Sequence, residues 1–172
     1  PTSYTITVNP YAQMNPVNDQ IICNEENLII EFTSDISGGV VTYEWTNDNT
    51  AIGLSNAGSG NINIIAANNS NQPITSTVEV TPSFENGGNI NYGDPISFTI
   101  TVNQTGLASI TNPIQILSNG FEISEILFGT ANTGGTTNYS WTNDNPTVGL
   151  AGNGDGDIGV FTAINIGSNP EI

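Results

Sequence analysis

Lysine, arginine and histidine are all missing from this chain of 172 residues, which carries 16 acidic residues and a formal charge of −16. Their absence removes a histidine general base, a lysine Schiff base, a phosphate-binding lysine and a histidine-bound zinc. Nucleic acids require a cationic protein surface, so we expect no nucleic-acid partner. Paired carboxylates could still hydrolyse a glycoside, but no basic residue is available to position a sugar. We therefore predict that the protein is not an enzyme.

Cysteine and long apolar runs are also scarce. Cys23 is the single cysteine, so no disulfide can form within the chain, and we expect Cys23 to serve as a small buried hydrophobe in the core. No stretch approaches the roughly 18 consecutive apolar residues of a membrane span, which predicts no membrane insertion. An acidic chain rich in Asn, Thr and Gly with little cysteine favours an extracellular or cell-surface location.

The lack of basic side chains also bears on pH dependence. No side-chain salt bridge can form, so crowded carboxylates have no cation to stabilise their charged form. We expect such carboxylates to have raised pKa values in the folded state. A raised pKa gives stability that is lost as pH rises, so mild acid should stabilise the fold.

The chain contains an internal repeat around two tryptophans. Residues 45–62 and residues 141–158 align without a gap at an offset of 96, and 10 of the 18 positions are identical. Each copy begins Trp-Thr-Asn-Asp-Asn, continues through Gly-Leu and ends in a glycine-rich turn. A period of this size indicates tandem domains.

Short alternating apolar runs predict strands, and glycine, asparagine and proline interrupt every window that could hold a helix. Expected strands include residues 28–32, 41–45, 62–66, 76–81, 95–103, 113–117, 121–128, 137–141 and 160–164. Residues 3–9 duplicate the alternation of residues 97–103 at an offset of 94. We predict an all-β chain of antiparallel β-sandwich modules. Residues 1–10 form the closing strand of a preceding repeat or a donated strand, residues 11–104 form the first module, and residues 105–172 form a second module without its last two strands.

Several of these runs together resemble one family. The segments TITVNP, WTNDN, IGL, GSGNI, PITSTVEVTPS and SFTITVN are similar to the PKD-like, immunoglobulin-like repeat modules of large secreted surface proteins of Bacteroidota-type bacteria. The resemblance covers nearly the whole chain. It implies tandem immunoglobulin-like sandwiches and a role as a stalk or spacer in a fibre or adhesin.

Two groups of residues are candidate sites. Trp45 and Trp141 could stack on sugars, but a tryptophan in the third strand is more often the core residue of an immunoglobulin-like sandwich. Carboxylates in Asx- and glycine-rich turns could present oxygen ligands to calcium, although Asx-turns explain the same residues without a metal. The calcium candidates are Asp48, Asp144, Asp155 and Asp157.

Three functional hypotheses follow. The first is a structural repeat segment of an extracellular fibre or adhesin stalk, in contact with neighbouring copies of the repeat in the same chain or in another subunit. The second is a filament subunit in which a donated strand with Tyr4, Ile6 and Val8 acts as Phe98, Ile100 and Val102 do in the first module. The third is a module that binds a glycan or a surface protein, with calcium as a possible cofactor.

Overall fold

The computed structural model describes residues 1–111 and 113–172. The chain divides into unit 1, Pro1–Thr105, and unit 2, Gly106–Ile172. The all-β class is confirmed, because the helical elements of the described chain are two short 3₁₀ turns, η1 (Thr50–Ile52) and η2 (Pro146–Val148). Among the described residues, no helix has the length and apolar character needed to span a membrane.

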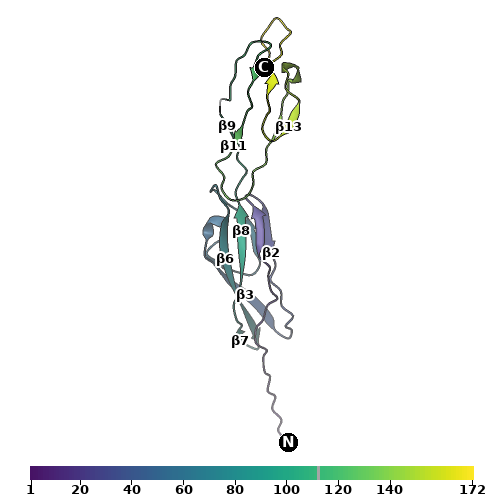
Figure 1. The fold of residues 1–172 in the computed structure, drawn as a ribbon. Coiled ribbons are helices and arrows are strands. Elements are labelled where there is room, and N and C mark those ends of the chain that lie inside the picture. The colour runs from purple at the N-terminus through teal and green to yellow at the C-terminus, as the bar shows by residue number, and fades with distance from the viewer. Residues whose placement is uncertain (112) are drawn as a thin grey trace. The chain divides into compact units, whose positions relative to one another are not determined.

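Unit 1 contains eight strands, most of them short (Figure 1). They are β1 (Gln20–Cys23), β2 (Asn27–Ile30), β3 (Val40–Asn47), β4 (Ala57–Ser59), β5 (Ile62–Ile65), β6 (Ile74–Asn86), β7 (Asn89–Tyr92) and β8 (Ile96–Asn103). One sheet has the order β1-β8-β6-β3-β4, with β7 also paired to β6, and a second sheet consists of β2 and β5. Every pair is antiparallel except β1 and β8, which run parallel.

The core of unit 1 lies between these two sheets. Alternate residues of β2, β6 and β8 are buried, as strands with one face against a core require. Burying these side chains supplies the main favourable term in folding, at roughly 25 cal/mol for each Å² of apolar surface removed from water. The buried cluster contains Leu28, Ile30, Ile62, Val78, Val80, Phe98, Ile100 and Val102, together with Trp45, Ile52 and Leu54.

The β6–β7 hairpin closes through Gly87 and Gly88, both of which have positive φ. Two consecutive residues with positive φ define the turn that matches the twist of paired strands, and glycine adopts it without steric cost. The two glycines therefore determine where β6 reverses.

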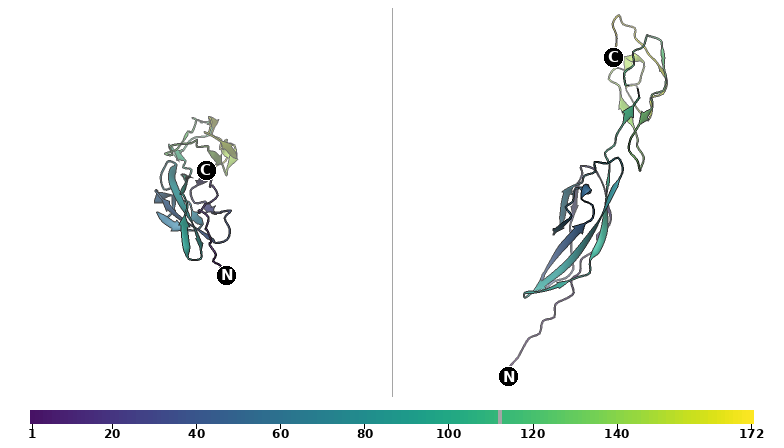
Figure 2. Two further views of the ribbon diagram at one scale, coloured as in Figure 1. Left: turned by 90° about the horizontal axis from the view of Figure 1, so that it is seen from below. Right: turned by 90° about the vertical axis from the view of Figure 1, so that its left-hand side faces the viewer.

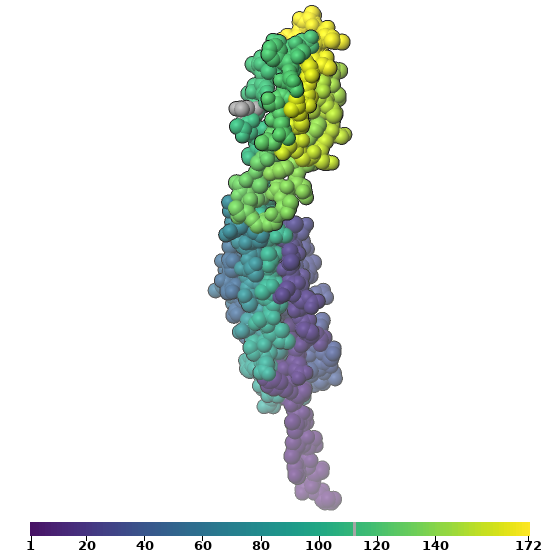
Figure 3. All heavy atoms as spheres, viewed as in Figure 1, coloured from purple at the N-terminus to yellow at the C-terminus, as the bar shows by residue number. Residues whose placement is uncertain are grey.

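The first residues of unit 1 form no strand. Tyr4, Ile6 and Val8 are 87%, 74% and 85% exposed, and the segment extends away from the rest of unit 1 in the right-hand view of Figure 2 and in Figure 3. Contact with the unit begins at Asn9, and Ala12 and Met14 are buried. Residues 1–10, expected as a closing or donated strand, thus form no strand in the described chain, although Asn9 hydrogen-bonds to Asn86 and the Pro10 carbonyl accepts from Asn91.

The described residues of unit 2 form six strands of two or three residues each. They are β9 (Ser109–Ile110), β10 (Glu122–Ile123), β11 (Phe128–Gly129), β12 (Ser140–Thr142), β13 (Asn153–Asp155) and β14 (Phe161–Thr162), paired as β9–β11, β10–β14 and β12–β13. The strand expected at residues 113–117 does not form, and the one expected at residues 121–128 is broken into short pieces. No described residue of unit 2 is fully buried, so these alternating segments have no core to pack against.

Candidate functional site

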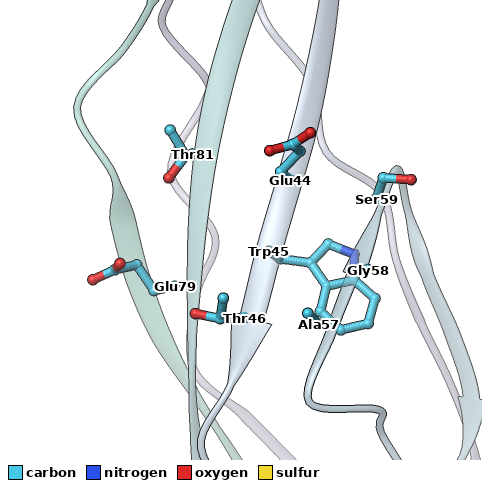
Figure 4. Close-up of a pocket in the computed structure, with 8 residues that line it drawn as sticks. All are labelled: Glu44, Trp45, Thr46, Ala57, Gly58, Ser59, Glu79 and Thr81. Carbon is cyan, nitrogen blue, oxygen red and sulfur yellow. The ribbon is translucent and has the colours of Figure 1, made fainter.

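The repeated motif forms a compact polar and aromatic structure at the end of β3, which we call the first frame (residues 45–62). Trp45 is 8% exposed and its Nε1 donates to the carbonyl of Gly60 at 3.1 Å. Its ring lies against Gly58 of β4, where an added Cβ would overlap the ring atoms (Figure 4). Trp45 is therefore a core residue whose position requires glycine on the adjacent strand, and its ring is not available to a sugar.

Asn47 is the polar centre of the first frame. It is 6% exposed, and its Nδ2 donates to the carbonyls of Leu54 at 2.9 Å, Ser55 at 3.1 Å and Asn49 at 3.2 Å. Its Oδ1 accepts from the Asn49 N–H and from the Ser76 hydroxyl. One buried amide thus satisfies the backbone of the loop around η1 and attaches it to β6.

Asp48 connects the same turn to β6 from the solvent side. Its Oδ1 accepts from the Thr77 N–H at 2.8 Å and from the Ser76 hydroxyl at 2.9 Å. The Thr77 hydrogen bond, followed by that of Ser76, lowers the pKa of Asp48. A hydrogen bond from the Thr99 N–H lowers the pKa of Asp19 in the same way. We expected carboxylate pKa values to rise for lack of cationic partners, but these two pKa values are lowered. Hydrogen bonds from backbone N–H groups stabilise the charged carboxylates in place of cations.

Residues 141–158, the second frame, form the same local structure in unit 2. Asn143 Nδ2 donates to the carbonyls of Leu150 at 3.0 Å and Asn145 at 3.2 Å, as Asn47 does to Leu54 and Asn49. The backbone bonds also match. The N–H of Gly156 donates to Tyr139 and the N–H of Asn143 to Gly152, each at 2.9 Å, as Gly60 donates to Tyr43 and Asn47 to Asn56 at the same distance.

The second frame differs from the first on the side where β6 lies in unit 1. Asn143 and Asp144 have no counterpart of Ser76 or Thr77 to bind, and Asp144 makes no hydrogen bond within the described chain. Trp141 is only half-buried, and its buried Nε1 has no partner among the described residues. Trp141 was expected to be a core residue, but in the structure its side chain is only partly covered by the described residues of unit 2.

The calcium candidates do not converge. Asp157 Oδ1 accepts from the Phe128 N–H at 2.7 Å, which is the role of Asn61 Oδ1 toward the Phe32 N–H at 2.9 Å in unit 1. Asp155 is exposed, and Asp48 accepts hydrogen bonds from Ser76 and Thr77 of β6. Within residues 1–111 and 113–172, no three Cys, Asp or Glu side chains come together as metal ligands. Asp157 replaces an asparagine in a strand-to-turn hydrogen bond, so the structure gives no geometric support to the calcium hypothesis.

An open groove of ≈ 520 Å³ lies beside the first frame (Figure 4). The exposed carboxylates of Glu44 and Glu79 stand beside it on the neighbouring strands β3 and β6, and a smaller groove of ≈ 270 Å³ lies beside Trp141. The larger groove contains no histidine, cysteine or basic group, and Trp45 turns its ring toward β4 (Figure 4). This arrangement supplies neither a stacking platform nor a general acid held in an apolar site.

The expected role of Cys23 is wrong. Cys23 is exposed, because the alternation of β1 turns Ile22 toward the core and Cys23 away from it. The closing-strand residues behave in two ways: Phe98, Ile100 and Val102 are buried in β8, whereas Tyr4, Ile6 and Val8 are exposed.

Sequence reasoning did not identify Asn68 and Ser76, the other buried polar residues of unit 1. Asn68 Nδ2 donates to the carbonyls of Val102 at 2.8 Å and Gln72 at 2.9 Å, and its Oδ1 accepts from the Ser70 N–H. The Asn-Asn-Ser spacing does indicate an Asx-turn, but nothing in it indicates that the asparagine is buried.

Comparisons with protein-family models, curated proteins and solved structures give no match to this chain.

Proposed function

We propose that the chain is a structural segment of an extracellular fibre or adhesin stalk, built from repeated immunoglobulin-like modules that provide reach and spacing. The observation that carries this proposal is the recurrence of the frame hydrogen bonds at an offset of 96 residues. A chain that forms the same polar and aromatic frame twice is using one module repeatedly. Repeated modules are how many proteins generate length.

The strands of unit 1 support an immunoglobulin-like module of the PKD-like kind. The sheet of β2 and β5 contributes to one core with the sheet that contains β3, β6 and β8. Trp45 lies on the third strand of the unit and packs into that core, as the tryptophan of immunoglobulin domains does. The surface favours a spacer as well, because a net charge of −16 opposes collapse of one module on another.

The pairing of β1 with β8 suits a load-bearing role. Gln20 pairs with Ile100 and Cys23 with Asn103, and the Asn24 N–H extends the ladder to the Asn103 carbonyl at 2.9 Å. Because the two strands run parallel, tension toward the N-terminus on β1 and toward the C-terminus on β8 pulls them in opposite directions along their axes. The hydrogen bonds between them are then loaded together rather than one after another.

Single-molecule pulling with two attachment geometries tests this role. Both proteins carry Cys23→Ser. In the first, handles are attached through Val8→Cys and Leu107→Cys, and in the second through Gln72→Cys and Leu107→Cys. The first geometry shears β1 against β8. The second separates β6 from β8 at the end where Ile74 pairs with Val102, so bonds break in sequence.

We expect unit 1 to unfold at a several-fold higher force in the shear geometry at equal pulling speed, because forced unfolding is governed by the unfolding barrier. Both proteins should show the same urea midpoint, which controls for effects of the cysteines themselves. Equal unfolding forces in the two geometries would count against a mechanical function.

A further inference from the structure

Residues 3–9 repeat the sequence of strand β8 almost completely. They read Ser-Tyr-Thr-Ile-Thr-Val-Asn, and residues 97–103 of β8 read Ser-Phe-Thr-Ile-Thr-Val-Asn, so six of the seven positions are identical. In β8 this sequence buries alternate side chains and pairs with β1 on one side and with β6 on the other. Because β8 already fills this position in unit 1, residues 3–9 have no equivalent position in the same module.

The apolar face of residues 3–9 is uncovered. Its three side chains are each at least 74% exposed, whereas their counterparts in β8 are at most 3% exposed. The pairs of equivalent residues are Tyr4 and Phe98, Ile6 and Ile100, and Val8 and Val102. Alternate side chains share one face of a strand, so a groove that buries the face of β8 also fits the face of residues 3–9.

Three polar groups from other parts of unit 1 bind the backbone of β8. They are Asp19 Oδ1, which accepts from the Thr99 N–H at 2.7 Å, Asn68 Nδ2, which donates to the Val102 carbonyl at 2.8 Å, and the Asn24 N–H, which donates to the Asn103 carbonyl at 2.9 Å. Residues 3–9 offer the same backbone groups in the same order, and no proline among them removes an N–H. The segment can therefore make every one of these bonds in a groove of the same kind.

The charge of the segment also suits an acidic partner. The chain has 16 acidic residues, but the first of them is Asp19, so residues 1–18 carry none. Strand β8 likewise contains no acidic residue. A module without lysine or arginine has no cation to offset a further carboxylate, so a strand without carboxylates can enter it without added repulsion.

We propose that residues 3–9 are an interaction strand whose partner is another module of the unit 1 kind, and that they insert between the β1-type and β6-type strands of that module. The strand runs parallel to the β1-type strand, with Asn9 opposite the counterpart of Cys23, as Asn103 is in unit 1. Its apolar face enters the core and its threonines face solvent. This assignment rests on the proposed function, because it requires a second module of the same kind.

Tyr4 makes the segment a poorer fit than β8 to unit 1 itself. Phe98 is 3% exposed, and its ring centroid lies 6.4 Å from that of Phe32 in the core. A tyrosine at this position brings a hydroxyl into an apolar environment, which is unfavourable without a hydrogen-bond partner. Residues 3–9 therefore do not displace β8 from its own module and remain available to another.

The direct test empties the β8 position of unit 1 and supplies the segment as a peptide. The acceptor is the full chain with Trp141→Phe and with residues 97–103 replaced by glycines and serines, and the probe is a synthetic peptide of residues 1–10. We expect saturable binding that shifts the Trp45 emission to the blue and slows exchange of the amides of residues 20–23 at least about tenfold.

Two further peptides control this experiment. The peptide of residues 1–10 with Ile6→Asp should neither shift the emission nor slow exchange, because it places a carboxylate in the core. The peptide of residues 95–104 is the positive control. Rescue of the emptied chain by residues 95–104 but not by residues 1–10 would overturn the proposal.

A single substitution tests the fit whether or not the emptied chain stays folded. Phe98→Tyr turns residues 97–103 into an identical copy of residues 3–9 within the full chain. In the Trp141→Phe background we expect Trp45 still to report one sharp urea transition, at a lower midpoint, whereas Ile100→Asp should abolish it. Loss of the transition in Phe98→Tyr would show that residues 3–9 do not fit a β8 position and would overturn the proposal.

Disulfide trapping tests the register. Cys23 is exposed and its Cα partner is Asn103, so Asn9 of the peptide should lie beside it. Under oxidising conditions, an Asn9→Cys peptide should link to Cys23 of the emptied chain at least about tenfold faster than a Thr5→Cys peptide, because disulfides need Cα atoms within about 7 Å. Equal rates would overturn the parallel register.

These tests are independent of the mechanical one. The pulling experiment measures the resistance of a unit 1 that keeps its own β8, and the peptide experiments measure recognition by an emptied groove. A failure of the strand assignment and a failure of the proposed function are therefore distinguishable.

Discussion

Individual residues of the first frame stabilise unit 1 in two ways, by apolar burial and by hydrogen bonding to buried backbone carbonyls. Trp45 supplies apolar burial and needs Gly58 opposite its ring, while Asn47 satisfies carbonyls that the loop around η1 leaves inside the unit. A buried carbonyl without a donor costs about 1–3 kcal/mol, so the amide is as much a core residue as the indole. This is why both residue types recur together in the sequence.

Replacing Asn47 should therefore destabilise unit 1 strongly. We expect Asn47→Ala to lower the free energy of unfolding by about 2–3 kcal/mol, because three carbonyls lose their donor at once. Urea denaturation monitored by Trp45 fluorescence in a Trp141→Phe background measures the effect. Asn143→Ala, the same change in unit 2, is the control and should leave the Trp45 transition unmoved. A loss below about 0.5 kcal/mol for Asn47→Ala would contradict this account.

The pH dependence of unit 1 follows from Asp48 and Asp19. Hydrogen bonds from Thr77 and Ser76 to Asp48, and from Thr99 to Asp19, lower both pKa values in the folded state. A lowered folded pKa gives stability that is present above the unfolded value, near 3.9, and is lost as pH falls through the folded value. We thus expect the melting temperature of unit 1 to fall as pH drops below about 4.

Asp48→Asn keeps an acceptor oxygen but removes the charge, so its melting temperature should fall less steeply in acid than that of the parent chain. Asp144→Asn is the control, because Asp144 makes none of these contacts in the described chain. Parallel acid curves for the parent and Asp48→Asn would show that Asp48 is not a source of this dependence.

At the scale of elements, two segments of nearly identical sequence differ in whether they pair as strands and bury their apolar side chains. Residues 97–103 form most of β8 and bury Phe98, Ile100 and Val102, whereas residues 3–9, with the same alternation, are exposed and unpaired. A single strand cannot satisfy its backbone or bury its apolar face without neighbours. For β8 these neighbours are β6 and β1.

Hydrogen exchange should separate the two segments within the 172-residue chain. We expect the amides of residues 98, 100 and 102 to exchange only when unit 1 opens, and those of residues 4–8 to exchange at the rate of an unstructured peptide. Mass spectrometry on peptides covering each segment gives both rates in one experiment, and a urea series identifies the opening of unit 1. Comparable protection in the two segments would contradict the difference in pairing.

At the scale of the whole molecule, the two units differ in burial rather than in local pattern. Unit 1 has a continuous cluster of buried side chains, while no described residue of unit 2 is fully buried. Cooperative unfolding depends on a shared core, because each buried side chain then depends on the others. The two frames should thus differ in how they unfold.

Denaturation with one tryptophan at a time tests this difference. In Trp141→Phe, the Trp45 signal should give a sharp sigmoidal urea transition. In Trp45→Phe, the Trp141 signal should change gradually and begin at lower urea. Far-ultraviolet circular dichroism of both variants should match the parent chain before unfolding, which controls for damage by the substitutions. Coincident sharp transitions for the two probes would show that the second frame has a cooperative core of its own.

The sequence by itself determined the all-β class and the positions of the two frames. These features depend on local rules: alternation, backbone freedom at glycine and the polar pattern around each tryptophan. Residue type also determined the excluded chemistries, because no fold can provide a base or a cation that the chain lacks.

Only the tertiary structure decided which copies are buried. The same alternation is core in β8 and exposed at residues 3–9, and Trp45 is covered where Trp141 is half-covered. It also turned Cys23 outward and placed Asp48 and Asp157 where they accept hydrogen bonds from the backbone of distant residues. Burial depends on partners distant in sequence, and the local pattern of a strand states only which face it can bury, not whether a neighbour is there to cover it.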